Sequence, residues 1–174
     1  MDGRLYRGAS GGAAELGHVV VQADGLPCRC GSNGCLEMYA SGSALARFAA
    51  VRAGDDETDP TGALQKLRIE GLLTGREVCR LARDGDAGAL GVVEELAGWL
   101  GIGLVNMAHV FDPEMIVVGG GAGELGELLI GPARAYLKKN AMPPARDLVR
   151  VASAKLGNRA GLVGGGLAAW EAFG

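Results

Sequence analysis

The sequence predicts an α/β protein that folds as one domain. Two short runs rich in β-branched residues, at 115–118 and 149–154, flank an amphipathic segment, which is the pattern of a strand–helix–strand unit. A long apolar segment punctuated by glycine precedes them. The chain has 174 residues, of which 48% are hydrophobic, so it is large enough to bury a core.

Charge and hydropathy exclude two classes of partner. The 17 basic and 20 acidic side chains give a net charge of −3, without a block of like charges that would attract nucleic acid. Uninterrupted apolar runs such as Met115 to Val118 are far shorter than the roughly 20 residues that span a bilayer, and no secretory signal begins the chain. We therefore expect neither a nucleic-acid nor a membrane partner. The 31 glycines follow no collagen period and predict tight turns and close packing instead.

The N-terminal third combines one turn, one strand and one loop. Asp2-Gly3 is a hairpin turn signal, with only its second strand, around Leu5, in the sequence. The chain thus resembles one that starts within a sheet, the alternative being a mobile N-terminus. The β-branched run from His18 to Gln22 predicts a buried strand, and residues 23–34 predict a polar loop.

Three helices follow, each with its own start signal. Ser41 is expected to cap a helix over Gly42 to Arg52. Residues 53–61, which follow, are expected to form a solvated connection. The capping-box spacing of Thr74 and Glu77 predicts a helix to about Arg83. Asp86 is expected to cap the longest helix, roughly 87–110. Its glycines at 91, 98, 101 and 103 each cost about 1 kcal/mol relative to alanine, so we expect that helix to pack closely on a sheet.

The C-terminal third carries the parallel unit. Asp112-Pro113 ends the long helix. The pattern then predicts, in order, a short buried strand at 115–118, a glycine turn at 119–121, a helix over 125–138, a strand at 149–154 in a right-handed parallel crossover, a glycine loop at 157–166 and a terminal helix ending near residue 173.

Candidate metal ligands gather in the N-terminal loop. Cys28, Cys30 and Cys35 lie within eight residues, and His18 precedes them by ten. Thiolate and imidazole are the ligands of tetrahedral structural Zn²⁺, which leaves no open position for catalysis. A disulfide is the first alternative, although a Cys-x-Cys bridge closes a strained ring. Reduced cysteines without a metal are the second.

Two carboxylates flank the candidate ligands. If one imidazole nitrogen of His18 binds zinc, the other is an N–H donor. Glu15 and Glu37 are then expected nearby as acceptors, an arrangement that suits the vicinal hydroxyls of a sugar or polyol. The alternative is that both acids are solvated surface residues.

The same residues resemble the signature of the ROK family of sugar kinases and repressors, and the chain is most similar to the glucokinases of that family. The matching runs are Glu15-Leu16-Gly17-His18, Cys28-Arg29-Cys30-Gly31-Ser32-Asn33-Gly34-Cys35-Leu36-Glu37, Ala40-Ser41-Gly42, Phe111-Asp112-Pro113, Val117-Val118-Gly119-Gly120-Gly121 and Ala160-Gly161-Leu162-Val163-Gly164.

The resemblance implies an actin-like ATPase (ribonuclease H-like) fold with an inserted zinc loop at 18–37. It implies structural Zn²⁺ on His18, Cys28, Cys30 and Cys35, and glucose hydroxyls on Glu15, His18 and Glu37. ATP would approach the turn Gly119, Gly120 and Gly121, with Mg²⁺ on its phosphates, to phosphorylate the sugar 6-hydroxyl. The resemblance also implies a cytoplasmic enzyme that forms homo-oligomers.

The sequence departs from the family pattern at its N-terminal side. The Asp-x-Gly-Gly phosphate motif and the Asn-Asp pair that supplies the general-base aspartate have no counterpart here, so no catalytic residue is expected within residues 1–174. We expect these residues to form a single C-terminal lobe without the N-terminal nucleotide lobe, and to transfer phosphate poorly alone.

Three alternatives remain at this point. The run Gly121-Ala122-Gly123-Glu124-Leu125-Gly126 satisfies the dinucleotide fingerprint, but the strand at 149–154 does not end in the acidic residue that this fingerprint requires. A sugar-sensing module without catalysis is a second alternative, since the family includes repressors. A kinase for another hexose, such as N-acetylmannosamine or fructose, is a third.

Overall fold

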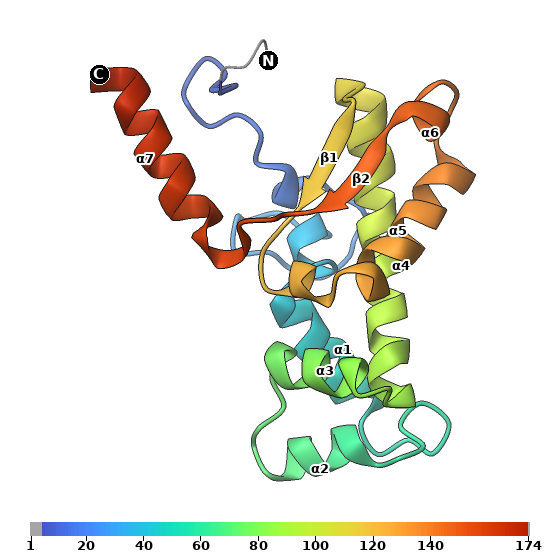
Figure 1. Ribbon diagram of the computed structural model, residues 1–174. Coiled ribbons are helices and arrows are strands. Elements are labelled where there is room, and N and C mark those ends of the chain that lie inside the picture. Colours follow the sequence, from blue (N-terminus) through green and yellow to red (C-terminus); the bar gives the residue numbers. More distant parts are fainter. Residues whose placement is uncertain (1–4, 174) are drawn as a thin grey trace.

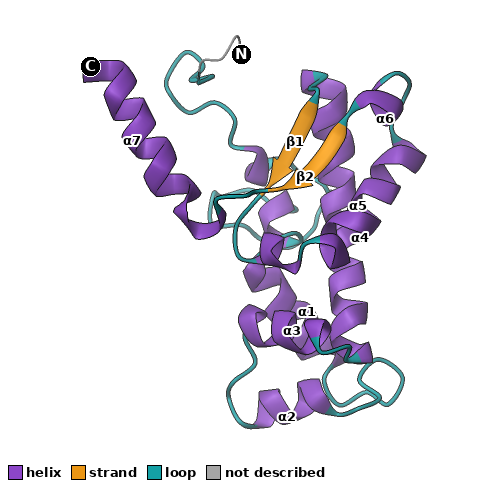
Figure 2. Ribbon diagram, viewed as in Figure 1, coloured by secondary structure: helices purple, strands orange, loops and turns teal. Residues whose placement is uncertain are grey.

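The computed structural model describes residues 5–173, so the expected turn at Asp2-Gly3 lies outside the described residues. Helices dominate this part of the chain, and one two-stranded sheet lies beside α4 and α5 (Figures 1 and 2). The elements are α1 (Gly42–Arg52), α2 (Ala63–Ile69), α3 (Gly75–Arg83), α4 (Ala87–Phe111), β1 (Met115–Val118), α5 (Glu127–Asn140), α6 (Ala145–Leu148), β2 (Arg150–Ser153) and α7 (Ala160–Phe173). Four 3₁₀ helices join them: η1 (Leu16–His18), η2 (Leu36–Met38), η3 (Ala122–Leu125) and η4 (Gly157–Arg159).

The predicted strand–helix–strand unit is confirmed. β1 and β2 pair in parallel, with Met115 opposite Arg150 and Val118 opposite Ser153, and α5 and α6 form the crossover. The crossover helix begins later than expected, because residues 122–125 form the 3₁₀ helix η3 first. The prediction that β1 is fully buried is wrong. Ile116 and Val118 face the core, whereas Val117 is 57% exposed, as the two-residue period of a strand covered on one face requires.

The three predicted helix starts are also confirmed. The Ser41 hydroxyl accepts from the Ala44 N–H at 3.2 Å, and the Asp86 carboxylate accepts from the Ala89 N–H at 2.8 Å. Thr74 accepts from the Glu77 N–H at 3.3 Å. Each cap thus satisfies an N–H that the helix itself leaves unpaired.

Helix α4 forms the centre of the core and packs most extensively on α5. Its closest neighbours lie on α5 and η2 and not on the sheet that the sequence led us to expect. An added Cβ at Gly101 would lie 2.6 Å from the Cβ of Tyr136 on α5, and one at Gly103 would lie 2.6 Å from a methyl of Leu36 in η2. By length and composition alone, α4 is the one helix of the described residues apolar enough to cross a membrane. Half of its apolar window is buried inside the protein, as in the core helix of a folded domain.

The expected strand at 18–22 does not form. His18 ends η1, Val20 makes only an isolated antiparallel bridge to Cys35, and Val20 is 49% exposed. The N–H groups of Val21 and Gln22 both turn toward the Gly34 carbonyl. The run therefore has strand-like composition but no neighbouring strand with which to build a ladder.

The sequence pattern missed a helix that follows one connection and a helix that lies within another. Residues 53–61, expected to be solvated, include Asp59, which is 3% exposed and whose carboxylate accepts from the N–H groups of Gly54, Leu64 and Gln65. It thereby starts α2. Residues 157–166, expected to be a glycine loop, are helical from Gly157 onward. Figure 1 shows that α7 stands away from the rest of the protein, and Leu162 on it is 80% exposed.

Candidate functional site

The loop 18–37 is folded back on itself by two glycine turns. Gly31 and Gly34 have φ angles of +92° and +74°, a region that favours glycine. A Cβ on Gly34 would also overlap the Gln22 carbonyl. The Cys28 N–H donates to the Ser32 carbonyl at 2.8 Å, so the chain reverses direction between the cysteines.

This reversal brings the four predicted metal ligands together. One donor atom from each of His18, Cys28, Cys30 and Cys35 lies within 4.8 Å of all the others. The Cys28 Sγ is 3.6 Å from the His18 Nδ1, and the Cys30 Sγ is 3.5 Å from the Cys35 Sγ. In a zinc tetrahedron with bonds of about 2.3 Å to sulfur and about 2.05 Å to nitrogen, the corresponding edges are about 3.6 and 3.8 Å. The donor set therefore fits a tetrahedral metal ion.

The spacing does not fit the disulfide alternative. A disulfide joins its sulfurs at about 2.05 Å, and the four cysteines are free thiols in this structure. The two neighbouring thiols differ electrostatically. Hydrogen bonding to the Ser32 backbone lowers the pKa of Cys30, whereas burial raises the pKa of Cys35 to about 12. A bound divalent cation would favour the thiolate at both.

The outer edge of the histidine faces a carboxylate. The His18 Nδ1 lies toward the cysteines, and its Nε2 lies 3.9 Å from Glu37 Oε2. The other carboxylate oxygen, Oε1, accepts from Arg29 at 3.2 Å. Both His18 and Glu37 are partly exposed, so a ligand from solvent reaches them. A ring nitrogen and a carboxylate oxygen thus stand side by side.

The third predicted sugar ligand lies apart from this pair. Glu15 is exposed at the start of η1. Within residues 5–173, its carboxylate makes no hydrogen bond or ion pair with His18 or Glu37, and Glu15 meets His18 only through the backbone, where the His18 N–H donates to the Glu15 carbonyl at 2.9 Å. The backbone nevertheless brings η1 and η2 together, because an added Cβ on Gly17 would lie 3.7 Å from the Glu37 Cβ.

Sequence reasoning missed the residues that hold this loop against the core. The Tyr39 hydroxyl accepts from the Leu26 N–H at 2.7 Å, and the Tyr39 ring lies 4.4 Å from that of Trp99 on α4. Leu36, between Cys35 and Glu37, packs into the space left by Gly103. The scarcity of aromatic residues, 5% of the chain, is the one signal that could have drawn attention to Tyr39.

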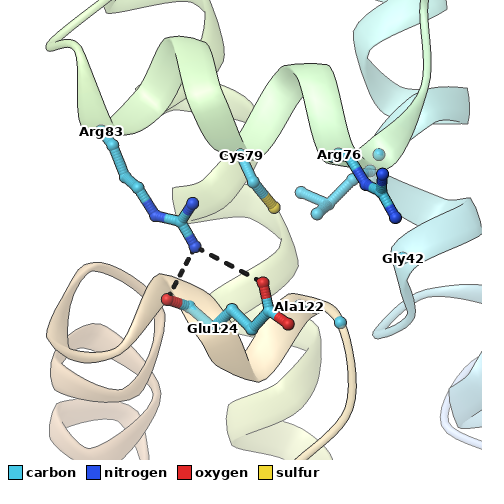
Figure 3. Close-up of a pocket in the computed structure, with 9 residues that line it drawn as sticks. Gly42, Arg76, Cys79, Arg83, Ala122 and Glu124 are labelled. Atoms are coloured by element: carbon cyan, nitrogen blue, oxygen red, sulfur yellow. Dashed lines mark hydrogen bonds and ion pairs between the residues drawn. The ribbon is translucent and has the colours of Figure 1, made fainter. Parts of the chain in front are cut away.

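Apart from the loop 18–37, a cavity lies next to the predicted glycine turn (Figure 3). It has a volume of about 320 Å³ and is lined by Gly42, Leu45, Gly75, Arg76, Cys79, Arg83, Gly121, Ala122 and Glu124. Of the three turn glycines, only Gly121 reaches it. An added Cβ on Gly119 would instead lie 3.3 Å from the Ala154 Cβ, and Gly120, with a φ of +84°, has no atom within 4 Å of an added Cβ.

Two helix N-termini and two arginines give this cavity a positive character. Gly42 and Gly75 are the first residues of α1 and α3, whose N–H groups carry partial positive charge. Arg83 donates to the Glu124 carbonyl at 2.9 Å and pairs with its carboxylate at 3.9 Å, whereas Arg76 is exposed at the cavity (Figure 3). Burial raises the pKa of the Cys79 thiol between them.

The sequence contains a signal for this cavity, which sequence reasoning missed. A capping residue is followed directly by glycine twice, at Ser41-Gly42 and at Thr74-Gly75. A Cβ on Gly75 would overlap the Gly42 carbonyl, so the two helix starts touch through their backbones. This close approach is what places both N-termini on one cavity.

Comparison with known proteins places the chain among sugar-related proteins. A model described as the ROK family matches residues 1–171. A glucokinase from Streptomyces coelicolor is 42% identical over 92% of this chain and 51% of its own length. A xylose repressor from Caldicellulosiruptor bescii is 30% identical over 94% of this chain and 40% of its own length.

A solved structure agrees with the sequence comparison. The crystal structure of a ROK family glucokinase from Streptomyces griseus, in complex with glucose and AMPPNP, superimposes with a TM-score of 0.80 at 40% identity. The match covers 92% of this chain and 52% of that one. The chain thus spans about half the length of the curated relatives that it matches.

Proposed function

Because the chain belongs to the ROK family, we propose that residues 1–174 form one lobe of an ATP-dependent glucokinase. The observation that carries the proposal is the pairing of His18 with Glu37 beside a ready set of metal ligands. The proposal includes phosphorylation of the glucose 6-hydroxyl, with Mg²⁺ on the ATP phosphates and the general base outside this lobe. It also includes a cytoplasmic location, where cysteines stay reduced, and homo-oligomers.

His18, Cys28, Cys30 and Cys35 would hold a structural zinc ion. Zinc supplies rigidity here, since four protein ligands leave no position for a water or substrate. Binding of the Nδ1 atom leaves the proton of His18 on Nε2. That nitrogen then faces Glu37 as a fixed donor, and the sugar site is organised before glucose arrives.

The pair is suited to two neighbouring hydroxyls. The distance of 3.9 Å between His18 Nε2 and Glu37 Oε2 is too long for a strong hydrogen bond between them. One hydroxyl can accept from Nε2 while the next donates to Oε2. Glu15 is assigned as the third sugar ligand on the family resemblance, and its exposed position at the start of η1 leaves its side chain free to turn toward the sugar.

The nucleotide is proposed at the turn of Gly119, Gly120 and Gly121. The cavity beside Gly121 supports this assignment, because two helix N-termini and the Arg76 guanidinium face it. Phosphate groups are stabilised at such helix starts. Its volume of about 320 Å³ is within the range of small-molecule sites.

A thermal-shift titration tests the sugar site. Glucose at millimolar concentration is expected to raise the Tm of the zinc-loaded chain by mass action. Glu37→Gln is expected to abolish the shift, because the amide presents a donor where the sugar hydroxyl needs an acceptor. Glu70→Gln, on the exposed end of α2, is the matched control and should leave the shift intact. A wild-type chain with no shift would leave the glucose assignment without support.

The xylose repressor among the relatives favours one second candidate, a sugar-sensing module without catalysis. Both candidates use the same sugar pair, so the choice of sugar discriminates between them. The kinase proposal expects a larger shift with glucose than with xylose, fructose or N-acetylmannosamine at equal concentration. A preference for xylose would favour the sensing module, and a preference for another hexose would reassign the kinase.

A further inference from the structure

We propose that a cavity on the far side of α1 binds a small aromatic monocarboxylate through Arg47. This cavity has a volume of about 540 Å³ and is separate from both sites described above. Its lining comes from α1, the connection before α2, one residue of α4 and one of the cysteine loop: Leu26, Arg47, Phe48, Val51, Arg52, Asp55, Thr58 and Glu95.

The two cavities lie on opposite faces of α1. Leu45 lines the cavity beside the glycine turn, and Arg47 lines this one. Two residues along an α-helix correspond to a rotation of about 200° around its axis. A ligand of the Arg47 cavity therefore does not compete with the proposed nucleotide, and the proposed sugar residues His18 and Glu37 are not part of its lining.

The guanidinium of Arg47 points to an anion. Its Nε and Nη2 atoms are buried, and no acceptor in the described part of the chain reaches them. Buried donors are almost always hydrogen-bonded, since leaving one unpaired costs about 1–3 kcal/mol, and more for a charged group. An arginine fork matches the two oxygens of a carboxylate.

The acids that line the cavity are already engaged elsewhere. Glu95 pairs with Arg52 at 2.9 Å. The Asp55 carboxylate accepts through Oδ1 from the Thr58 N–H at 2.8 Å and from the Glu57 N–H at 3.0 Å. Neither acid hydrogen-bonds to Arg47. Protein atoms cover Nε and Nη2, so a ligand meets them when the side chain turns toward the cavity that it lines.

The walls decide which kind of anion fits. Leu26, Phe48 and Val51 give the cavity an apolar surface, and the Arg47 Cζ lies 5.6 Å from the centroid of the Phe48 ring. A flat aromatic body can pack on that ring while its carboxylate meets the guanidinium. Hydrogen bonds from Thr58 and Glu57 lower the pKa of Asp55, so it is ionised at neutral pH. Its charge opposes a dianion more strongly than a monoanion.

The probe is benzoate, and its binding to the full chain is measured by ligand-observed NMR relaxation. We expect binding in the millimolar range, and weaker binding of both the neutral isostere benzamide and the dianion phenylphosphonate. Arg47→Met keeps the apolar stem and should weaken benzoate binding by about tenfold or more, the size of a lost charge-assisted bond. Arg146→Met removes one charge from exposed α6 and should leave binding unchanged.

A second variant keeps Arg47 in place. Val51 is 80% exposed, so Val51→Trp should fold normally and fill the cavity, again abolishing benzoate binding. The proposal is overturned if benzoate fails to bind the wild-type chain up to tens of millimolar. It is also overturned if benzamide binds equally well, or if the Arg47→Met and Val51→Trp variants retain wild-type affinity.

Discussion

Three glycines of α4 differ in what surrounds them, and replacing each by alanine should give three different results. Gly98 has no atom within 4 Å of an added Cβ. At Gly101 the added atom would lie 2.6 Å from both Cβ and Cγ of Tyr136. At Gly103 it would lie 2.6 Å from one methyl of Leu36 and 3.0 Å from the other.

The magnitudes follow from two opposing terms. Alanine favours the helix over glycine by about 1 kcal/mol in a helix interior. Gly98→Ala should therefore raise the free energy of unfolding by about 0.5–1 kcal/mol. At Gly101 the clash involves atoms close to the α5 backbone, which must move by about 1 Å to restore ordinary contact. Overpacking of this kind costs about 1–3 kcal/mol, so Gly101→Ala should be neutral to about 2 kcal/mol destabilising.

Gly103→Ala differs because its neighbour is the flexible end of a side chain. Leu36 can change rotamer, which keeps the loss of stability small. Leu36 directly precedes Glu37, however, so its displacement should reduce the glucose-induced shift in Tm. Gly101→Ala should leave that shift unchanged. Of the three variants, only Gly103→Ala is thus expected to reduce sugar binding while changing the free energy of unfolding little.

The assay is urea unfolding of the three variants at one pH, together with a glucose titration of each variant. The wild-type chain and Gly98→Ala serve as the two references. If Gly101→Ala stabilised the protein as much as Gly98→Ala does, α4 and α5 would not be packed as described. Equal glucose responses in the variants at 101 and 103 would refute the proposed contact between α4 and the sugar site.

The remaining predictions concern the metal, one buried cap, one ion pair and the reaction. Metal analysis should find about one zinc per chain, and Cys30→Ser should abolish it; a metal-free but fully folded wild-type protein would contradict the zinc assignment. Asp59→Ala should lower the free energy of unfolding by about 1–3 kcal/mol in a urea titration, because three N–H groups lose their acceptor, and Asp59→Asn should lower it less. The hydrogen bond from Arg134 lowers the pKa of Glu127 below 4.5, so the stability from this pair is present above that pH and is lost as the pH falls through the folded-state pKa. Urea titrations from about pH 6 to pH 3 should show a shallower loss for Glu127→Gln, and parallel curves would argue against the pair. The 174-residue chain alone should show negligible ATP-dependent glucose phosphorylation in a coupled assay, and robust turnover would mean that a general base lies within it.

The features predicted from sequence are those whose partners are local. Ser41, Thr74 and Asp86 each bond to an N–H three residues later, so their spacing alone identifies a helix start. The metal ligands were predicted for the same reason. Three of the four lie in one short loop, and zinc chemistry restricts the residue types that gather there.

The features that were missed or wrong depend on distant partners. A β-branched run such as 18–22 becomes a strand only beside another strand, and Val20 meets only Cys35. The close packing of α4 was expected, but its partners, Tyr136 and Leu36, lie more than thirty residues away in sequence. Neither set of partners is visible in a local pattern. Asp59 differs, because it accepts from N–H groups only five and six residues away, a spacing that differs from the three residues of a helix cap.

The loop 18–37 has little regular structure of its own, so we expect its position to depend on α4 and on the proposed metal. In the described residues, its β-pairing consists of the isolated bridges Val20–Cys35 and Pro27–Asn33, and its other backbone hydrogen bonds, such as that from the Gly34 N–H to the Leu26 carbonyl, belong to turns and loops. Contacts from Tyr39 to Trp99 and from Leu36 to the space at Gly103 fix its C-terminal end to α4. Neither contact holds the segment between Cys28 and Cys35, which carries three of the four metal donors. A zinc ion bound there would join that segment to His18, and the ring nitrogen facing Glu37 would then be placed by the core helix and the metal together.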